Sequence, residues 1–511
     1  MKFLGYIFVL QLAALSQGFA VLQPTSNRLK NVGHQQSMVV QGAPAKLIPA
    51  ALSVRGGSTG LALIENMRTS MASSPTGLFN GLFVGLAALA VASKAAQQIA
   101  VKQGSGSSSS EEKPKSVISL QARFLAVFWL VRMSDWLQGP YFYEVYASKI
   151  FNGVPASIDT ISKLFLMGFA TTGILGPWVG RQVDIRGRRA GTIAFTVLYA
   201  LGALSTRANS LLWLYLGRIA GGVGTSLLFS APEAWMVGEH QRSGHDGRWI
   251  GQTFGWAYAG DAVVAILAGQ CASSAADAAG PTGPYTLSLG FLAAAAALAL
   301  AMWKENRAPK ESSGATVTIK DAWEEIRGDP KVMLVGAVQA LFEGAMYTFV
   351  IQWVPALRAA IEATGFGPPG APVPFGKVFS CFMVCCLLGT TAFGGAQARG
   401  VPVEASTLAM LAVGTAAMGA AAALGPTSLT ALVAAFFVFE ACVGTYFPSI
   451  GTLRSKYISD RRRSVVMNLF GIPLNLLVVA VFLSLKRLGV RGALGVSAGA
   501  LGLGTLCMAA L

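Results

Sequence analysis

The residues best able to do chemistry in this chain are charged side chains inside long apolar stretches. Two are arginines, which can donate hydrogen bonds to an anion, and five are carboxylates, which can carry a proton or hold a cation. An ionised group at the centre of a bilayer costs roughly 2.5–3.5 kcal/mol on insertion scales, so each needs a partner, a proton or a wet cavity. The set is Arg132, Asp135, Arg218, Glu233, Asp261, Glu343 and Glu440.

Spacing separates the two arginines. Arg132 and Asp135 are three residues apart, which places them on one face of a helix, where they can neutralise each other. Arg218 has no acidic residue three or four positions away, so it is the better candidate to bind an anion while a carboxylate accepts a coupling proton. The alternative is that all seven residues form structural ion pairs. Five acids against two arginines would by themselves favour cation or proton handling.

These residues lie in segments long enough to cross a bilayer, which takes about 20 residues each. With 53% hydrophobic and 12% charged residues among 511, the chain is too apolar for a soluble protein. We therefore predict an all-α membrane protein with twelve transmembrane helices. The predicted spans are residues 118–141, 158–180, 190–206, 210–236, 249–271, 284–303, 332–357, 375–396, 403–424, 427–450, 464–485 and 490–511.

Basic residues predict the orientation of these spans. Most lysines and arginines between spans fall in the loops that follow even-numbered spans, and the positive-inside rule places those loops on the cytosolic or stromal side. The longest of these loops, residues 304–331, follows the sixth span. It divides the carrier region into two predicted six-helix halves, residues 117–303 and 332–511.

The two halves repeat their charged positions at a nearly constant offset. Positions 135 and 343 are 208 apart, and positions 233 and 440 are 207 apart, each of the latter within Phe-x-x-x-Glu-Ala. Parallel repeats of this kind place the substrate path between the halves, near the middle of the bilayer. The equivalent pairs are Asp135 with Glu343, Glu233 with Glu440, and Asp261 with Asn468, so Asn468 joins the candidate path.

A short basic loop follows the second span and begins at Gly180, with the sequence Gly-Arg-Gln-Val-Asp-Ile-Arg-Gly-Arg-Arg. It resembles the loop between the second and third helices of major facilitator transporters. The resemblance implies that Gly180 and Gly187 allow a tight turn, and that Asp184, Arg188 and Arg189 close an inner gate by contacting a neighbouring span. The alternative is an ordinary positive-inside loop.

The N-terminal region has the composition of a targeting sequence. Residues 1–18 have the charge and apolar core of a signal peptide, and residues 19–103 form a basic, acid-poor targeting region. With Phe19 after the predicted cut, the region resembles the presequence of plastid proteins in algae with secondary plastids; a plain secretory signal is the alternative. An apolar run at 78–92 is a possible extra helix, and residues 104–116 are a predicted flexible linker.

The sequence lacks the residue patterns expected of an enzyme, a metal-binding protein or a nucleic-acid-binding protein. There is no Gly-rich lysine loop for ATP, and the three histidines lie outside the spans. The six cysteines lie in or beside apolar stretches without metal-ligand spacing, and the net charge of +16 is explained by inner loops and the N-terminal region. We expect no catalytic residue, no cofactor, no metal and no nucleic-acid partner. The expected partners are membrane lipid, a small solute and protons. We expect the protein to be a monomer.

Four longer segments make the resemblance specific. Residues 135–141 (Asp-Trp-Leu-Gln-Gly-Pro-Tyr), 230–235 (Ser-Ala-Pro-Glu-Ala-Trp), 342–350 and 439–458 resemble the molybdate-anion transporter family of the major facilitator superfamily. These segments extend over the region 117–511. The departure is Gly471, where the resemblance leads us to expect an arginine.

The resemblance implies uptake of the molybdate oxyanion by alternating access, with proton coupling left open. Guanidinium groups bind tetrahedral oxyanions bidentately, so Arg132 and Arg218 are the expected donors. Arg454 and Lys456 are expected to anchor the inner end of the tenth span to lipid headgroups. Residues alone do not choose between molybdate and sulfate. The expected location is a plastid membrane, with the cell membrane as the alternative.

Two other classes of function stay open. A facilitator for sugars or other neutral metabolites would use aromatic platforms, and a receptor-like scaffold would no longer transport. The aromatic residues available to a sugar carrier are Trp136, Tyr141, Trp235, Tyr347 and Trp353.

Overall fold

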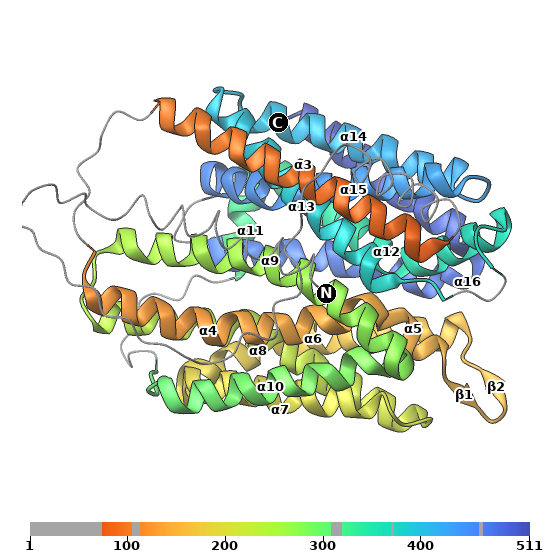
Figure 1. Ribbon diagram of the computed structural model, residues 1–511. Coiled ribbons are helices and arrows are strands. Elements are labelled where there is room, and N and C mark those ends of the chain that lie inside the picture. Colours follow the sequence, from red (N-terminus) through yellow and green to blue (C-terminus); the bar gives the residue numbers. More distant parts are fainter. Residues whose placement is uncertain (1–73, 105–112, 308–318, 369–371, 459–462) are drawn as a thin grey trace, which may run out of the picture.

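The computed structural model describes residues 74–104, 113–307, 319–368, 372–458 and 463–511. The predicted signal peptide, most of the targeting region and most of the linker lie outside these residues. The predicted all-α architecture is confirmed: long helices account for nearly all of the described chain, and they form two groups, seen below and above the centre in Figure 1.

The first group contains the six predicted spans of the N-terminal half. A 3-10 turn, η1 (Gly139–Tyr141), a short helix, α5 (Phe142–Ala147), and a hairpin of β1 (Ile150–Phe151) and β2 (Val154–Pro155) follow its first helix, and the 3-10 turn η2 (Gly280–Thr282) precedes its last. The long helices are α4 (Lys115–Gln138), α6 (Ile158–Arg186), α7 (Arg188–Ser205), α8 (Leu211–Arg242), α9 (Gly247–Ala279) and α10 (Gly283–Met302).

The second group contains the predicted spans of the C-terminal half. A short helix, α11 (Ile319–Gly328), precedes it, and the last helix breaks at Gly489, where φ is 61°, so that one assigned helix supplies two spans. The long helices are α12 (Pro330–Thr364), α13 (Phe375–Ala398), α14 (Val403–Leu424), α15 (Leu429–Tyr457) and α16 (Arg463–Ala509).

Local sequence explains where several helices begin and end. The Ser157 hydroxyl accepts from the amide of Thr160 at the start of α6, and Asp329 caps α12, whose first residue is Pro330. Gly187 has φ 129°, which lets α6 end and α7 begin with no further residue between them.

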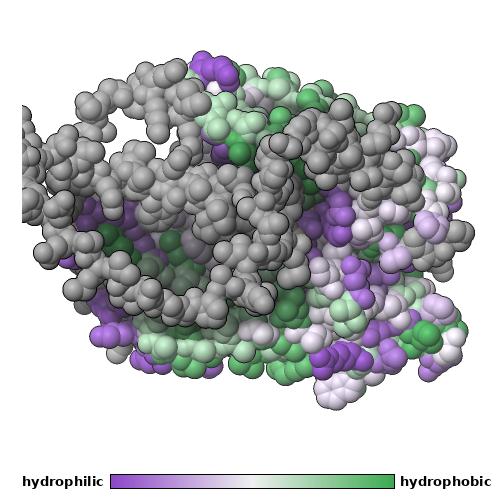
Figure 2. All heavy atoms as spheres, viewed as in Figure 1, coloured by the Kyte–Doolittle hydropathy of each residue, from purple (hydrophilic) through white to green (hydrophobic). Residues whose placement is uncertain are grey.

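An apolar surface surrounds the bundle. Ten helical segments among the described residues are long and apolar enough to cross a membrane, and one of them, Trp249–Met302, contains most of α9 and all of α10. Green, hydrophobic side chains form patches on the coloured part of the face shown in Figure 2, and Ile174 and Leu506 are 75% and 68% exposed. Exposed apolar area of this extent indicates contact with lipid.

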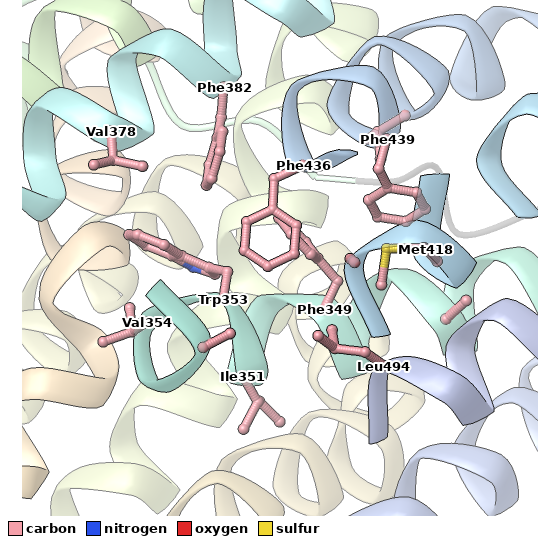
Figure 3. Close-up of a cluster of buried hydrophobic side chains, with 14 of the residues drawn as sticks. Phe349, Ile351, Trp353, Val354, Val378, Phe382, Met418, Phe436, Phe439 and Leu494 are labelled. Atoms are coloured by element: carbon pink, nitrogen blue, oxygen red, sulfur yellow. The ribbon is translucent and has the colours of Figure 1, made fainter. Parts of the chain in front are cut away.

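The C-terminal half has an aromatic core. Phe349 lies 5.0 Å from Phe436 and 5.1 Å from Phe439, measured between ring centroids, and Phe382 packs against Trp353 at 5.2 Å. Figure 3 shows these rings facing one another from α12, α13 and α15. This packing holds the helices of the half together as one unit.

The two halves meet through α9 with α13 and through α6 with α16. The α9–α13 contact is close because both helices carry glycine there: a Cβ at Gly376 would lie 2.2 Å from the carbonyl oxygen of Gly269. We call the end of the bundle with the β1–β2 hairpin the hairpin end, and the end with the basic loop 180–189 the basic end.

Bonds between the halves lie toward the hairpin end. The Ser380 hydroxyl donates to the Ile266 carbonyl at 2.8 Å, and Arg358 on α12 pairs with Glu144 on α5 at 2.6 Å. The described halves are therefore closed against each other at the hairpin end.

A further helix, α3 (Pro75–Gly104), lies outside these two groups and includes the apolar run at 78–92. It packs along α13, in red to orange in Figure 1. Phe79 is fully buried and its carbonyl oxygen lies 3.7 Å from the Cys381 sulfur, while Gln97 lies against Gly394 at the basic end. The helix thus runs the length of α13.

Candidate functional site

In the N-terminal half, the central charged residue is Arg132 on α4. Its Nε and Nη2 each lie 2.9 Å from one oxygen of the Asp261 carboxylate on α9, a bidentate pair, and its Nη1 lies 3.7 Å from Asp135. The Trp136 indole also donates to Asp261, at 2.8 Å. Asp261, rather than its helix neighbour Asp135, is therefore the closer partner of Arg132.

Asp135 has a second polar partner that the sequence did not suggest. The Tyr199 hydroxyl, on α7, donates to its Oδ1 at 2.8 Å, and the same hydroxyl lies 3.1 Å from Thr225 on α8. The Asp135 side chain is 25% exposed. Arg132, Asp135 and Asp261 thus form one network that ties three spans together through Tyr199.

Arg218 on α8 lies apart from that network. Its Nε donates to the Leu164 carbonyl at 3.2 Å, and its guanidinium carbon lies 4.4 Å from the Phe142 ring centroid. A Cβ at Gly168 would lie 2.1 Å from Arg218 Nη2, so only glycine leaves room for the guanidinium there. No carboxylate of the described residues pairs with Arg218.

The repeat-related glutamates have different surroundings. Glu233 accepts a hydrogen bond from Tyr258, whose ring is 52% exposed. Glu440 is only 7% exposed, and the Cys386 thiol on α13 donates to its Oε2 at 2.9 Å. Neither carboxylate has a basic partner among the described ion pairs.

Glu343 on α12 belongs to a polar group in the C-terminal half. The Tyr446 hydroxyl donates to its Oε1 at 2.8 Å, and Arg454 Nη2 lies 3.4 Å from the same oxygen. Arg454 Nε also donates to Gln339, at 3.1 Å. Arg454 therefore turns toward α12 instead of anchoring the helix end, whereas Lys456 pairs with Glu404 at 2.5 Å.

Asn468 lies on α16, but its side chain is outside the described residues. Three residues on, Gly471 is half-buried, and the nearest atom to a Cβ placed there is the Asn475 amide nitrogen, at 3.9 Å. The space where the resemblance suggests an arginine is open. The missing positive charge is not replaced by a described basic side chain at that position.

The basic loop is fastened to the segment that follows α10. Glu305 accepts from the backbone amides of Arg189 and Ala190 at 2.8 and 2.9 Å, so its carboxylate caps the start of α7. Asp184 pairs with Arg188 at 3.0 Å, and the Arg189 guanidinium donates to a backbone carbonyl.

The loop glycines have different surroundings. A Cβ at Gly187 would lie 2.3 Å from the Glu305 carboxyl carbon, whereas one at Gly180 would meet nothing within 4 Å. Gly187 is therefore required by the Glu305 cap as well as by its backbone angle.

The structure thus groups the predicted residues into separate sites. Arg132, Asp135 and Asp261 form one network, and Glu343 joins Arg454 in another. Arg218, Glu233 and Glu440 stand apart, each with neutral partners. Sequence reasoning missed the residues that complete these groups, although a tyrosine or glutamine inside a span is itself a signal of a polar partner: Gln339, Cys386, Tyr199, Tyr258, Tyr446 and Glu305.

Solved structures with a similar arrangement of helices identify the fold. The nucleoside transporter NupG matches with a TM-score of 0.61 at 12% identity, covering 77% of this chain and 99% of its own. The peptide transporter PepTSo matches with a TM-score of 0.60 at 11% identity, covering 78% and 98%. At such low identity these matches show the fold alone. The protein has the major facilitator fold, with twelve transmembrane helices in two halves.

Homologous proteins identify the family to which the chain belongs. A family model described as sugar transporters with twelve transmembrane segments matches residues 78–442. The molybdate-anion transporter of Takifugu rubripes is 31% identical over 396 residues, covering 71% of this chain and 79% of its own. That of Xenopus laevis is 30% identical over 404 residues, covering 76% and 85%. The chain belongs to the molybdate-anion transporter family of the major facilitator superfamily, and it is not an enzyme.

Proposed function

We propose that this protein carries the molybdate oxyanion across a membrane by alternating access. The name of its relatives supports the substrate, and the contacts between the halves support the mechanism. A carrier closed at the hairpin end must break the Glu144–Arg358 and Ser380–Ile266 contacts to open there. The observation that carries the proposal is the guanidinium of Arg218, which is inside a span and free of described carboxylate partners.

The surroundings of Arg218 suit a tetrahedral dianion. Its planar fork can present two parallel N–H groups to two oxygens of an oxyanion, which Lys cannot reproduce. The Leu164 carbonyl and the Phe142 ring hold the guanidinium in place without neutralising it, and Gly168 leaves room for it. Arg132, by contrast, already gives both arms of its fork to Asp261.

The test is uptake of labelled molybdate into proteoliposomes that contain purified protein. Arg218→Lys is expected to weaken uptake more than tenfold, or roughly 1.4 kcal/mol, while insertion and thermal stability stay near those of the parent. Arg207→Lys is the matched control, because Arg207 is exposed at a helix end and contacts Thr286. If Arg218→Lys transports like the parent, Arg218 only supports helix packing.

The same assay separates the other two classes. The description of the matching family model and the exposed rings of Tyr258 and Phe229 favour a carrier for neutral sugars as the second candidate. Labelled sugar uptake that molybdate leaves unchanged would support that carrier against ours. A protein that moves neither solute would be a receptor-like scaffold.

We also propose that transport is coupled to protons and that the membrane is that of a plastid. Glu440, buried beside a thiol without a described basic partner, is suited to carry a proton. The plastid location rests on residues 1–116 and is tested by fusing them to a fluorescent reporter in an alga with a secondary plastid. A reporter found only at the cell surface would favour the plain signal peptide.

A further inference from the structure

Among the arginines that have an acidic partner inside the bundle, Arg454 makes the weakest contact with its carboxylate. Its Nε donates to Gln339 at 3.1 Å, and its Nη2 lies 3.4 Å from Glu343, close to the limit for a hydrogen bond. Its side chain is 20% exposed, and its Nη1 has no recorded partner within the described chain. Arg132 differs, with two contacts of 2.9 Å to a single carboxylate. Arg454 can therefore exchange the Glu343 carboxylate for another anion at a smaller cost in free energy than Arg132 can exchange Asp261.

The position of Arg454 suits a ligand that enters or leaves at the basic end. It lies near the end of α15, and its two partners lie on α12. These are the tenth and seventh spans, which the repeat relates to α8 and α4, the helices that carry Arg218 and Arg132.

Building on the proposed function, we propose that Arg454 and Gln339 form a second oxyanion site, at the basic end, separate from Arg218. Glu343 occupies Arg454 while this site is empty. When an oxyanion arrives, it takes the guanidinium fork and the Gln339 amide turns to donate to it. Glu343 keeps its hydrogen bond from Tyr446, at 2.8 Å, which leaves the released carboxylate with a partner.

Competition between the carboxylate and the oxyanion has an unusual consequence. Removing the charge of Glu343 should strengthen oxyanion binding at this site, because the competing anion is lost and the guanidinium becomes available. A residue that only stabilises the helix packing would not act in this way. Removing the fork of Arg454 should weaken binding, because an ammonium cannot donate bidentately.

The experiment measures equilibrium binding of labelled molybdate to the purified full-length protein, and uptake from each face of oriented vesicles. Arg454→Lys is expected to weaken binding about tenfold and to slow entry from the basic face more than from the hairpin face. Glu343→Gln is expected to bind several-fold more tightly. The matched controls are Lys456→Arg and Glu404→Gln, a pair of an exposed lysine on α15 and a partly buried glutamate on α14, which should behave like the parent.

A second substitution keeps the test informative if Arg454→Lys misfolds. Gln339→Glu places another carboxylate against Arg454 and should weaken binding even if Arg454→Lys fails to fold. Parental binding and basic-face entry in both Arg454→Lys and Gln339→Glu would overturn this site while leaving the Arg218 result untouched. Weaker binding in Glu343→Gln would contradict competition between Glu343 and the oxyanion for Arg454. A parent that binds no molybdate would overturn the proposed function, and this site with it.

Discussion

Arg132, Arg218 and Arg454 are one residue type in similar helices, yet they face different partners. Arg132 is held by two carboxylates, Arg454 by one carboxylate and an amide, and Arg218 by a carbonyl and an aromatic ring. Removing both ions from water is costly, so a pair such as Arg132–Asp261 is stable only while both members are present. The same reasoning makes Arg218 the guanidinium with the most to gain from an anionic ligand.

This predicts the effect of breaking the N-terminal network. Asp261→Asn leaves the nearly buried Arg132 with Asp135, at 3.7 Å, as its only described carboxylate contact, and should destabilise the protein by about 3 kcal/mol or more. Thermal unfolding of the purified protein in detergent measures this. Asp159→Asn, which breaks an exposed pair with Lys163, should change little. Equal melting temperatures for the two variants would contradict a structural role for Asp261.

At the scale of elements, the α6–α7 loop is the clearest mechanical feature. Glu305 caps α7, and Asp184 pairs with Arg188 across the turn at Gly187. Loop and α10 therefore move together as part of the N-terminal half. We expect this arrangement to contact the other half when the basic end closes.

We predict that Asp184→Asn lowers the turnover of transport more than it lowers expression. Loss of the charge weakens the loop in the form closed at the basic end, which the carrier must visit in each cycle. Uptake rate divided by the amount of protein in the vesicle measures this. Arg186→Gln, an exposed charge in the same loop, is the control. Normal turnover in Asp184→Asn would make the loop a simple topological signal.

Helix α3 allows a prediction about topology. Pro75 lies against Gly367, in the connection between α12 and α13, while Gln97 lies against Gly394 near the other end of α13. If α3 is a thirteenth span, Ser74 and the basic loops lie on opposite faces of the membrane. A cysteine at Ser74 should react with an impermeant maleimide from the hairpin face, with the parent as control. Reaction from the basic face would show that α3 does not cross the bilayer.

At the scale of the whole molecule, coupling requires a group that changes protonation as the halves rearrange. Glu440 is enclosed beside Cys386, whereas Glu233 bonds to the exposed Tyr258. We predict that Glu440→Gln still exchanges molybdate across the membrane but loses accumulation driven by a proton gradient. Glu233→Gln tests the repeat-related position in the same assay. Unchanged accumulation in both variants would leave the two carboxylates structural.

The sequence by itself determined the class of fold. Runs of apolar residues predicted the twelve spans, because in lipid a backbone must satisfy its hydrogen bonds within each helix. Loop 180–189 predicted the α6–α7 turn, and the Phe-x-x-x-Glu-Ala repeat predicted the equivalence of the halves. These features are local or periodic, so a linear pattern contains them. The molybdate family was also predicted from segments 135–141 and 439–458 and is confirmed by the relatives.

Only the tertiary structure decided which charges meet. Spacing along α4 suggested Asp135 for Arg132, but the fold brings Asp261 closer from 129 residues away. Arg454 was expected at the headgroups, and packing of α15 on α12 instead brings it to Gln339 and Glu343. The physical reason is that partners on different helices depend on helix rotation and crossing. Those are set by side-chain packing across the whole bundle, and no local spacing in the sequence records them.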